Sequence, residues 1–141
     1  MNSPRYDIDA YLAGIFDGEG HISISCDLRR KWSIYVEIGA TNTCIAPLNL
    51  LKKAYGGNVR PRTVPKGHKP CWCWKASGKD AHWALSRMQP WLLIKRHKAK
   101  VALSILKYRS LHMAGGLVSP HQKMAITKAL RGVHVIEKRS Q

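Results

Sequence analysis

Two consecutive stretches in which apolar and polar residues alternate constrain the fold of this chain most. They occupy residues 21–28 and 31–41, and the basic run Arg29-Arg30-Lys31 joins them. A period of two is typical of a strand that is buried on one face only. Two such strands with a short connection predict an antiparallel hairpin with one apolar face and one polar face.

Helical segments and a second pair of strands surround this hairpin. Asp7 is a suitable N-cap for a first helix, Gly18 suits a left-handed C′ position at its end, and Asp80 can cap a later helix. The tail after Arg131 has weak periodicity and is expected to be loose. The predicted elements are helices over 7–16, 47–55, 80–88, 95–113 and about 119–130, and strands over 21–28, 31–41, 58–64 and 71–77. This order predicts an α+β fold of αββαββα type, with an antiparallel sheet covered by helices on one face and an extra C-terminal helix.

The chain is short enough to form a single domain, and its charge indicates the partner. Its 141 residues predict one domain, with a core over about 6–113 and a C-terminal helix and tail over about 117–141. Twenty-four Lys and Arg against eight Asp and Glu give a net charge of +16, which favours a polyanionic partner. Nucleic acid is the first candidate. A membrane is disfavoured because no apolar run approaches the ~18 residues that span a bilayer, and the polar N-terminus does not resemble a signal peptide.

The cysteines do not follow a disulfide or zinc pattern. Cys71-x-Cys73 lacks the spacing of a zinc knuckle, and no matching pair follows it. Free thiols in a reducing, intracellular compartment are therefore expected.

A stripe of small residues marks the first helix as a packing surface. Ala10, Gly14 and Gly18 recur every four residues, so a second helix could approach closely on that face. The predicted dimer interface consists of Ala10, Ala13, Gly14 and Asp17. A two-fold pair is the commonest way to cover such a face.

The same helix carries a recognisable motif. Leu12-Ala13-Gly14-Ile15-Phe16-Asp17-Gly18-Glu19-Gly20 matches the nine-residue LAGLIDADG signature with conservative departures. Together with the element order, Gly56-Gly57, and Gln89-Pro90-Trp91-Leu92 followed by Lys95, the sequence resembles the single-motif LAGLIDADG homing endonucleases over about residues 6–110. The resemblance implies a homodimeric, site-specific endonuclease that cleaves both strands of a long pseudo-palindromic DNA site with Mg²⁺ or Mn²⁺.

The motif also points to the residues of the reaction. Glu19 is predicted just past a helix C-terminus, where a carboxylate beside unpaired carbonyls, such as that of Gly18, suits a hard cation. The resemblance assigns Lys95 to charge stabilisation at the phosphate and Asp17 to bracing the helix end. A water-holding residue is expected near the end of the second strand, where Asn42 or Thr41 could serve. Asn42 could equally cap the next helix.

The polar face of the predicted sheet is expected to lie in the major groove of DNA, where base pairs are distinguishable. Arg60 and Arg62 are equally suited to reading guanine and to contacting phosphate, whereas Trp72 and Trp74 are assigned to the core. The predicted DNA-contacting residues are Ser23, Ser25, Asp27, Arg29, Ser33, Tyr35, Glu37, Arg60, Arg62 and Lys75.

Two alternatives remain at the level of sequence. One is a non-cleaving nucleic-acid binder on the same fold, either an RNA maturase or a transcriptional regulator. The other is a basic nucleic-acid-binding module of unrelated fold, for which the motif would be a coincidence.

Overall fold

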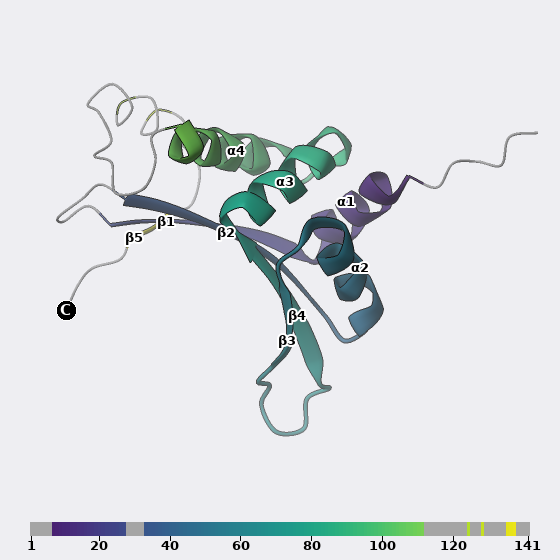
Figure 1. Ribbon diagram of the computed structural model, residues 1–141. Helices are drawn as coiled ribbons and strands as arrows, with labels where there is room; N and C mark the ends of the chain where they lie inside the picture. The colour runs from purple at the N-terminus through teal and green to yellow at the C-terminus, as the bar shows by residue number, and fades with distance from the viewer. Residues whose placement is uncertain (1–6, 28–32, 112–123, 125–127, 129–134, 138–141) are drawn as a thin grey trace, which may run out of the picture.

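A five-stranded sheet with helices on one side forms the structure of this chain, a computed structural model that describes residues 7–27, 33–111, 124, 128 and 135–137 (Figure 1). Arg29 and almost all of the predicted helix over 119–130 lie outside these residues. The strands, in sheet order, are β3 (Asn58–Arg62), β4 (Cys71–Ser77), β2 (Ser33–Asn42), β1 (Gly20–Asp27) and β5 (Val135–Glu137). The helices are α1 (Ile8–Glu19), α2 (Ile45–Tyr55), α3 (Gly78–Met88), the 3₁₀ turn η1 (Gln89–Trp91) and α4 (Arg96–Leu111).

The sheet confirms the predicted α+β fold class. The pairs β1–β2, β2–β4 and β3–β4 are all antiparallel. The short strand β5 was not predicted, because its three residues show no periodicity and the tail was expected to be loose. It pairs in parallel with β1 through Ile24 and Val135, so it covers part of an edge whose main-chain groups would otherwise lack partners.

The hydrophobic core lies between the covered face of the sheet and α1–α4. Ile24 and Ile38 of the central strands are fully buried, as are Leu12 and Phe16 of α1. Trp74 is fully buried as predicted, and its indole Nε1 donates to the Gly56 carbonyl at 2.8 Å. Trp72 is partly buried against the same core. The alternation in the sequence therefore separates core residues from the polar face.

The end of α1 differs from the prediction. The helix continues to Glu19, so Glu19 is its last residue and does not lie beyond it. Gly18 lies inside the helix and lacks the left-handed backbone expected of a C′ glycine. Gly20 ends the helix with an extended backbone, and a Cβ there would lie 2.4 Å from Phe16 Cδ2. The glycine required at this helix end is thus Gly20, because Phe16 packs directly against it.

Asp80 also has a role other than the predicted one. The helix α3 begins at Gly78, before Asp80, and its N-cap is Ser77. The Asp80 carboxylate instead accepts the Gly57 N–H at 3.1 Å. Gly56 and Gly57 both have positive φ (87° and 81°), so Asp80 fastens the turn from α2 to β3.

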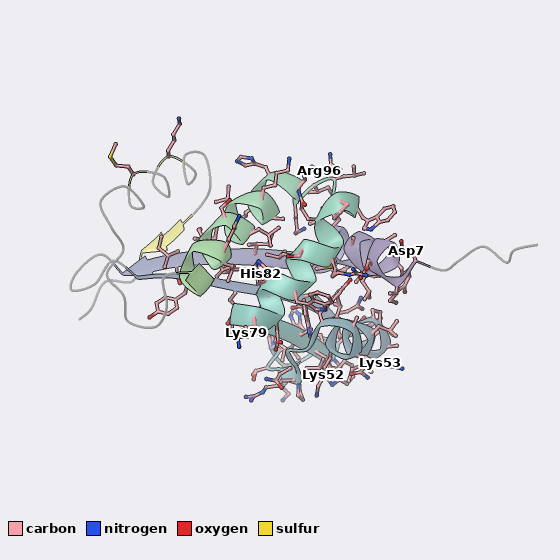
Figure 2. All side chains as sticks on the ribbon, turned by 45° about the horizontal axis from the view of Figure 1, so that its top comes forward. Asp7, Lys52, Lys53, Lys79, His82 and Arg96 are labelled. Atoms are coloured by element: carbon pink, nitrogen blue, oxygen red, sulfur yellow. The ribbon has the colours of Figure 1, made fainter. Side chains whose placement is uncertain are left out.

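The outer surface of the helices is basic. Figure 2 shows Lys52 and Lys53 on α2, Lys79 and His82 on α3, and Arg96 at the start of α4, all of which are exposed. Among the described residues, no helix combines the length and apolar character needed to cross a bilayer.

Candidate nucleic-acid interface and cleavage site

The C-terminus of α1 is joined to the N-terminus of α4 through Asp17 and Lys95. The Asp17 carboxylate accepts the backbone N–H groups of Leu93 (2.7 Å), Ile94 (3.2 Å) and Lys95 (3.0 Å). In return, Lys95 Nζ donates to the Asp17 carbonyl at 2.6 Å. The carboxylate thus supplies acceptors at the start of α4, and the ammonium supplies a donor at the end of α1, where helices lack partners.

The charge of Asp17 is stabilised where it lies. Partial burial raises the pKa of Asp17, but the three N–H donors and the nearby Lys95 ammonium outweigh it and leave the pKa below its ordinary value. Asp17 therefore remains a carboxylate and braces the helix ends, the structural role expected from the motif. The placement of Asp17 in a dimer interface stays a prediction, because Asp17 is partly exposed as well as bonded within the chain.

Two other predicted interface positions do lie at the surface of α1. Gly14 is exposed and Ala10 is half-buried, whereas Ala13 is fully buried with Leu12 and Phe16. The assignment of Ala13 to the interface is therefore wrong, because Ala13 lies on the core-facing side of the helix. Gly18 is exposed and continues the surface stripe of Ala10 and Gly14.

Glu19 is exposed at the end of α1, two residues beyond the carbonyl that binds Lys95. Within the described residues, no group of three His, Cys, Asp or Glu side chains could hold a metal ion. A single carboxylate beside last-turn carbonyls such as that of Gly18 still fits Mg²⁺ or Mn²⁺. Mg²⁺ in particular keeps several waters and is commonly bound through one or two carboxylates plus phosphate oxygens.

The end of β2 lies beside this helix terminus, because Ala40 pairs with Gly20. Alternation along β2 puts Thr41 on the open face and Asn42 on the face covered by helices. The Asn42 side-chain oxygen accepts the Cys44 N–H at 2.9 Å just before α2. Asn42 therefore makes a local turn bond before α2 but does not cap the helix, whose N-cap is Cys44. Of the two candidates, Thr41 is the one on the open face.

The open face of the sheet collects the predicted DNA-contacting residues. Strand register places Ser23 opposite Glu37, Ser25 opposite Tyr35 and Asp27 opposite Ser33. Lys75 is aligned with both Gly39 and Asn58, and Arg60 and Arg62 are aligned with Cys73 and Cys71. The predicted contact residues whose side chains the structure describes therefore belong to one surface: Ser23, Ser25, Tyr35, Glu37, Arg60, Arg62 and Lys75.

This surface is hollowed where β2, β3 and β4 meet. The concavity has a volume of about 800 Å³, and its lining includes His21, Glu37, Thr41, Arg60, Arg62 and Lys75. Lys75 Nζ lies 3.5 Å from Glu37 Oε1, so part of its charge is balanced by the neighbouring strand. Arg60 and Arg62 are exposed and are the principal positive groups of the described open face.

His21 lines the same concavity and was not among the predicted contacts. Gly39 lies opposite His21, and a Cβ on Gly39 would be 2.6 Å from His21 Cε1. Burial, together with the charges of Lys75, Arg62 and Lys95, lowers the pKa of His21 despite the opposing effect of Glu37. The sequence did indicate this position, because His21, Ser23 and Ser25 are spaced two residues apart. That spacing places all three on one face of β1.

No family model and no curated relative matches the chain, but solved structures do. I-CvuI in complex with the I-CreI target has a TM-score of 0.57 and 21% identity, and the match covers 91% of this chain and 96% of that one. I-TnaI, a homing endonuclease, has a TM-score of 0.61 and 19% identity over 92% of this chain and 89% of that one. The LAGLIDADG homing endonuclease I-GzeII, in complex with its DNA target, has a TM-score of 0.61 and 15% identity, with coverage of 94% and 51%. This chain has the LAGLIDADG homing-endonuclease fold.

The nine-residue motif spans the end of α1 and the start of β1. The motif forms the last eight of the twelve residues of α1 and ends at Gly20, the first residue of β1. Glu19 therefore lies exposed at the junction between α1 and β1. The match to I-GzeII also shows that one copy of this chain spans about half of a longer member of the fold.

Proposed function

We propose that this chain is a site-specific, metal-dependent DNA endonuclease that acts as a homodimer. The observation that carries the proposal is the junction at the end of α1, where the Lys95 ammonium is held at the Asp17 carbonyl beside the exposed Glu19. The junction borders an open, basic sheet face of a fold whose members I-CvuI and I-GzeII have been solved with DNA. A carboxylate and a fixed ammonium next to a polyanion-binding surface are suited to phosphodiester hydrolysis.

Dimerisation is supported by the exposed surface around the α1 stripe. Gly14 and Gly18 have open space where a Cβ would be, so a partner helix could approach their backbone. Leu93 and Ile94, whose N–H groups bind Asp17 beside this stripe, are 80% and 78% exposed. A second copy would cover these apolar side chains and bring two Glu19 residues together, one for each DNA strand.

Each residue of the site then has a defined task. Glu19, with the Gly18 carbonyl, would hold the divalent ion. A bound Mg²⁺ or Mn²⁺ supplies positive charge that stabilises the attacking and leaving oxygens of the scissile phosphate. Lys95 contributes a fixed charge near that phosphate, and Thr41 offers a hydroxyl on the open face. Arg60, Arg62 and Lys75 bind the flanking duplex through bases or phosphates.

The test begins with selection of cleaved sites from a randomised duplex library in Mg²⁺. The purified protein should enrich one pseudo-palindromic sequence, and Glu19→Gln should bind that sequence in Ca²⁺ but fail to cleave it in Mg²⁺. Glu37→Gln is the matched control, because it removes a carboxylate from the same face but away from the helix end. It should alter recognition while the bound complex still cleaves.

Two outcomes would contradict the proposal. Wild-type rates in Glu19→Gln would place the catalytic acid elsewhere. Tight, selective binding by the wild type without cleavage in Mg²⁺ or Mn²⁺ would instead identify a non-cleaving regulator or RNA maturase on the same fold.

A further inference from the structure

We propose that His21 is a specificity-determining residue that reads the innermost base pair contacted in each half of the DNA site. This inference rests on the proposed function, because it assumes that the open face of the sheet lies on DNA. It concerns a residue that carries no part of the cleavage chemistry assigned above.

The position of His21 follows from the chain path. Glu19 ends α1, Gly20 begins β1, and His21 is the first residue of β1 on the open face. Ser23 and Ser25 follow on the same face, each about two strand residues further from the helix end. Among the described open-face residues of β1, His21 is therefore the nearest to Glu19 and the proposed two-fold axis.

The imidazole is also held in place. It lies against Gly39 so closely that a Cβ there would be 2.6 Å from Cε1 and 3.0 Å from Nε2. Glycine at position 39 therefore makes room for the ring on the floor of the concavity. A half-buried ring packed against a neighbouring strand loses less conformational freedom on binding than an exposed side chain, which favours selectivity in a contact.

The chemistry suits a base edge better than a phosphate. An imidazole presents ring nitrogens that can donate or accept hydrogen bonds, and the major-groove edges of base pairs offer both kinds of partner. Full positive charges suited to phosphate are available on the exposed Arg60 and Arg62 of β3, which β4 and β2 separate from β1. His21 lines the same concavity as these arginines, but it lies on β1 opposite Gly39, one position after the Gly20–Ala40 pair at the end of α1.

The experiment compares cleavage profiles on duplexes in which every position of the selected site is varied singly. His21→Ala and His21→Gln should lower discrimination by about 5- to 100-fold at one position per half-site, with little change elsewhere. Ser23→Ala is the matched control, and any effect that it has should fall at a position further from the centre. Thermal melting of each variant verifies folding, and the polar His21→Gln keeps a test available if His21→Ala melts early.

The outcomes separate this inference from the proposed function. If the wild type selects and cleaves a site but the His21 variants keep its profile, His21 does not read bases. A uniform loss of binding at all sequences would mark His21 as a phosphate contact and would also overturn the inference. If the wild type selects no DNA at all, the proposed function fails, and the assignment of His21 fails with it.

Discussion

Asp17 and Lys95 are each used twice at the junction of α1 and α4. The side chain of Asp17 binds three backbone N–H groups while its carbonyl binds the Lys95 ammonium. Lys95 likewise offers both its main-chain N–H and its side chain. The stability of the fold and the position of a proposed catalytic charge therefore depend on the same pair of residues.

Replacement of Asp17 by Asn should therefore affect both properties. The amide keeps one acceptor oxygen but loses the charge that stabilises the start of α4, so the free energy of unfolding should fall by about 1–3 kcal/mol. Urea denaturation would measure this loss. Cleavage should also slow, because Lys95 is no longer held in place. An unchanged unfolding midpoint would show that the carboxylate does not brace the helices.

Replacement of Lys95 by Met should separate chemistry from binding. The change keeps most of the aliphatic stem and removes a charge near the scissile phosphate, so single-turnover cleavage should slow by roughly 10- to 1,000-fold. Binding in Ca²⁺ should change little. Lys98→Met, in the first turn of α4, is the control and should cleave at the wild-type rate. Equal reductions of the cleavage rate in the two variants would indicate that the lower net positive charge, and not the position of Lys95, slows cleavage.

At the scale of elements, alternation was sufficient to predict β1, β2 and β4 and to separate their two faces. It also predicted that Trp74 is buried. Helix ends were predicted less well. Gly20, not Gly18, ends α1, because Phe16 packs directly against position 20 and leaves no room for a side chain there. The bonds from Asp17 to residues 93–95 span more than 70 positions and have no periodic signature, so only the family resemblance indicated the bracing role. Thr41 and Asn42 could not be separated until strand register was known.

Three helices are linked by a polar network that the sequence did not reveal. The Tyr55 hydroxyl on α2 donates to Asp9 Oδ1 on α1 at 2.6 Å, and Arg87 on α3 lies 2.9 Å from Asp9 Oδ2. Burial and the bond to Asp9 raise the pKa of Tyr55 well above its ordinary value. The hydroxyl therefore remains a donor throughout the neutral pH range.

Tyr55→Phe should destabilise the helical layer without affecting recognition. It removes one partly buried hydrogen bond to a charged acceptor, which costs about 1.5–3 kcal/mol. Because the folded-state pKa of Tyr55 is raised, this contribution is complete below the unfolded pKa near 10 and is lost only as the pH rises above it. Chemical denaturation at pH 6 and pH 9 should thus give the same difference from wild type. A difference that vanishes at pH 9 would contradict the network.

At the scale of the molecule, the proposed two-fold assembly depends on the apolar surface beside α1. Ile94→Asp should place two charges in that interface and yield a monomer by sedimentation at micromolar concentration. Thr43→Asp adds the same charge at an exposed loop position and should leave the dimer intact. A dimeric Ile94→Asp protein would require a different interface.

Positive charge lies on both sides of the molecule, but only one side faces the proposed duplex. Affinity for the selected site should fall steeply with salt, with each neutralised phosphate adding roughly −0.9 to the log–log slope. Arg62→Ala should make that slope shallower by about one phosphate if the side chain binds the backbone. Lys52→Ala, on the outer surface of α2, should leave it unchanged. Equal changes in both variants would place DNA on the helical side.

The alternation of the strands has a consequence for how such a protein can change its target. Neighbouring residues of β4 lie on opposite faces of the sheet. Trp74 is fully buried in the core, whereas Lys75 is exposed on the open face. Substitutions at outward positions can therefore accumulate without repacking the interior, and the fold tolerates a sequence-diverse surface over a fixed scaffold. If the open face binds DNA as proposed, a change in the target could be followed by single exchanges at Arg60, Arg62 or Lys75, each at little cost to folding. Retargeting by directed evolution should accordingly be limited by recognition chemistry rather than by stability.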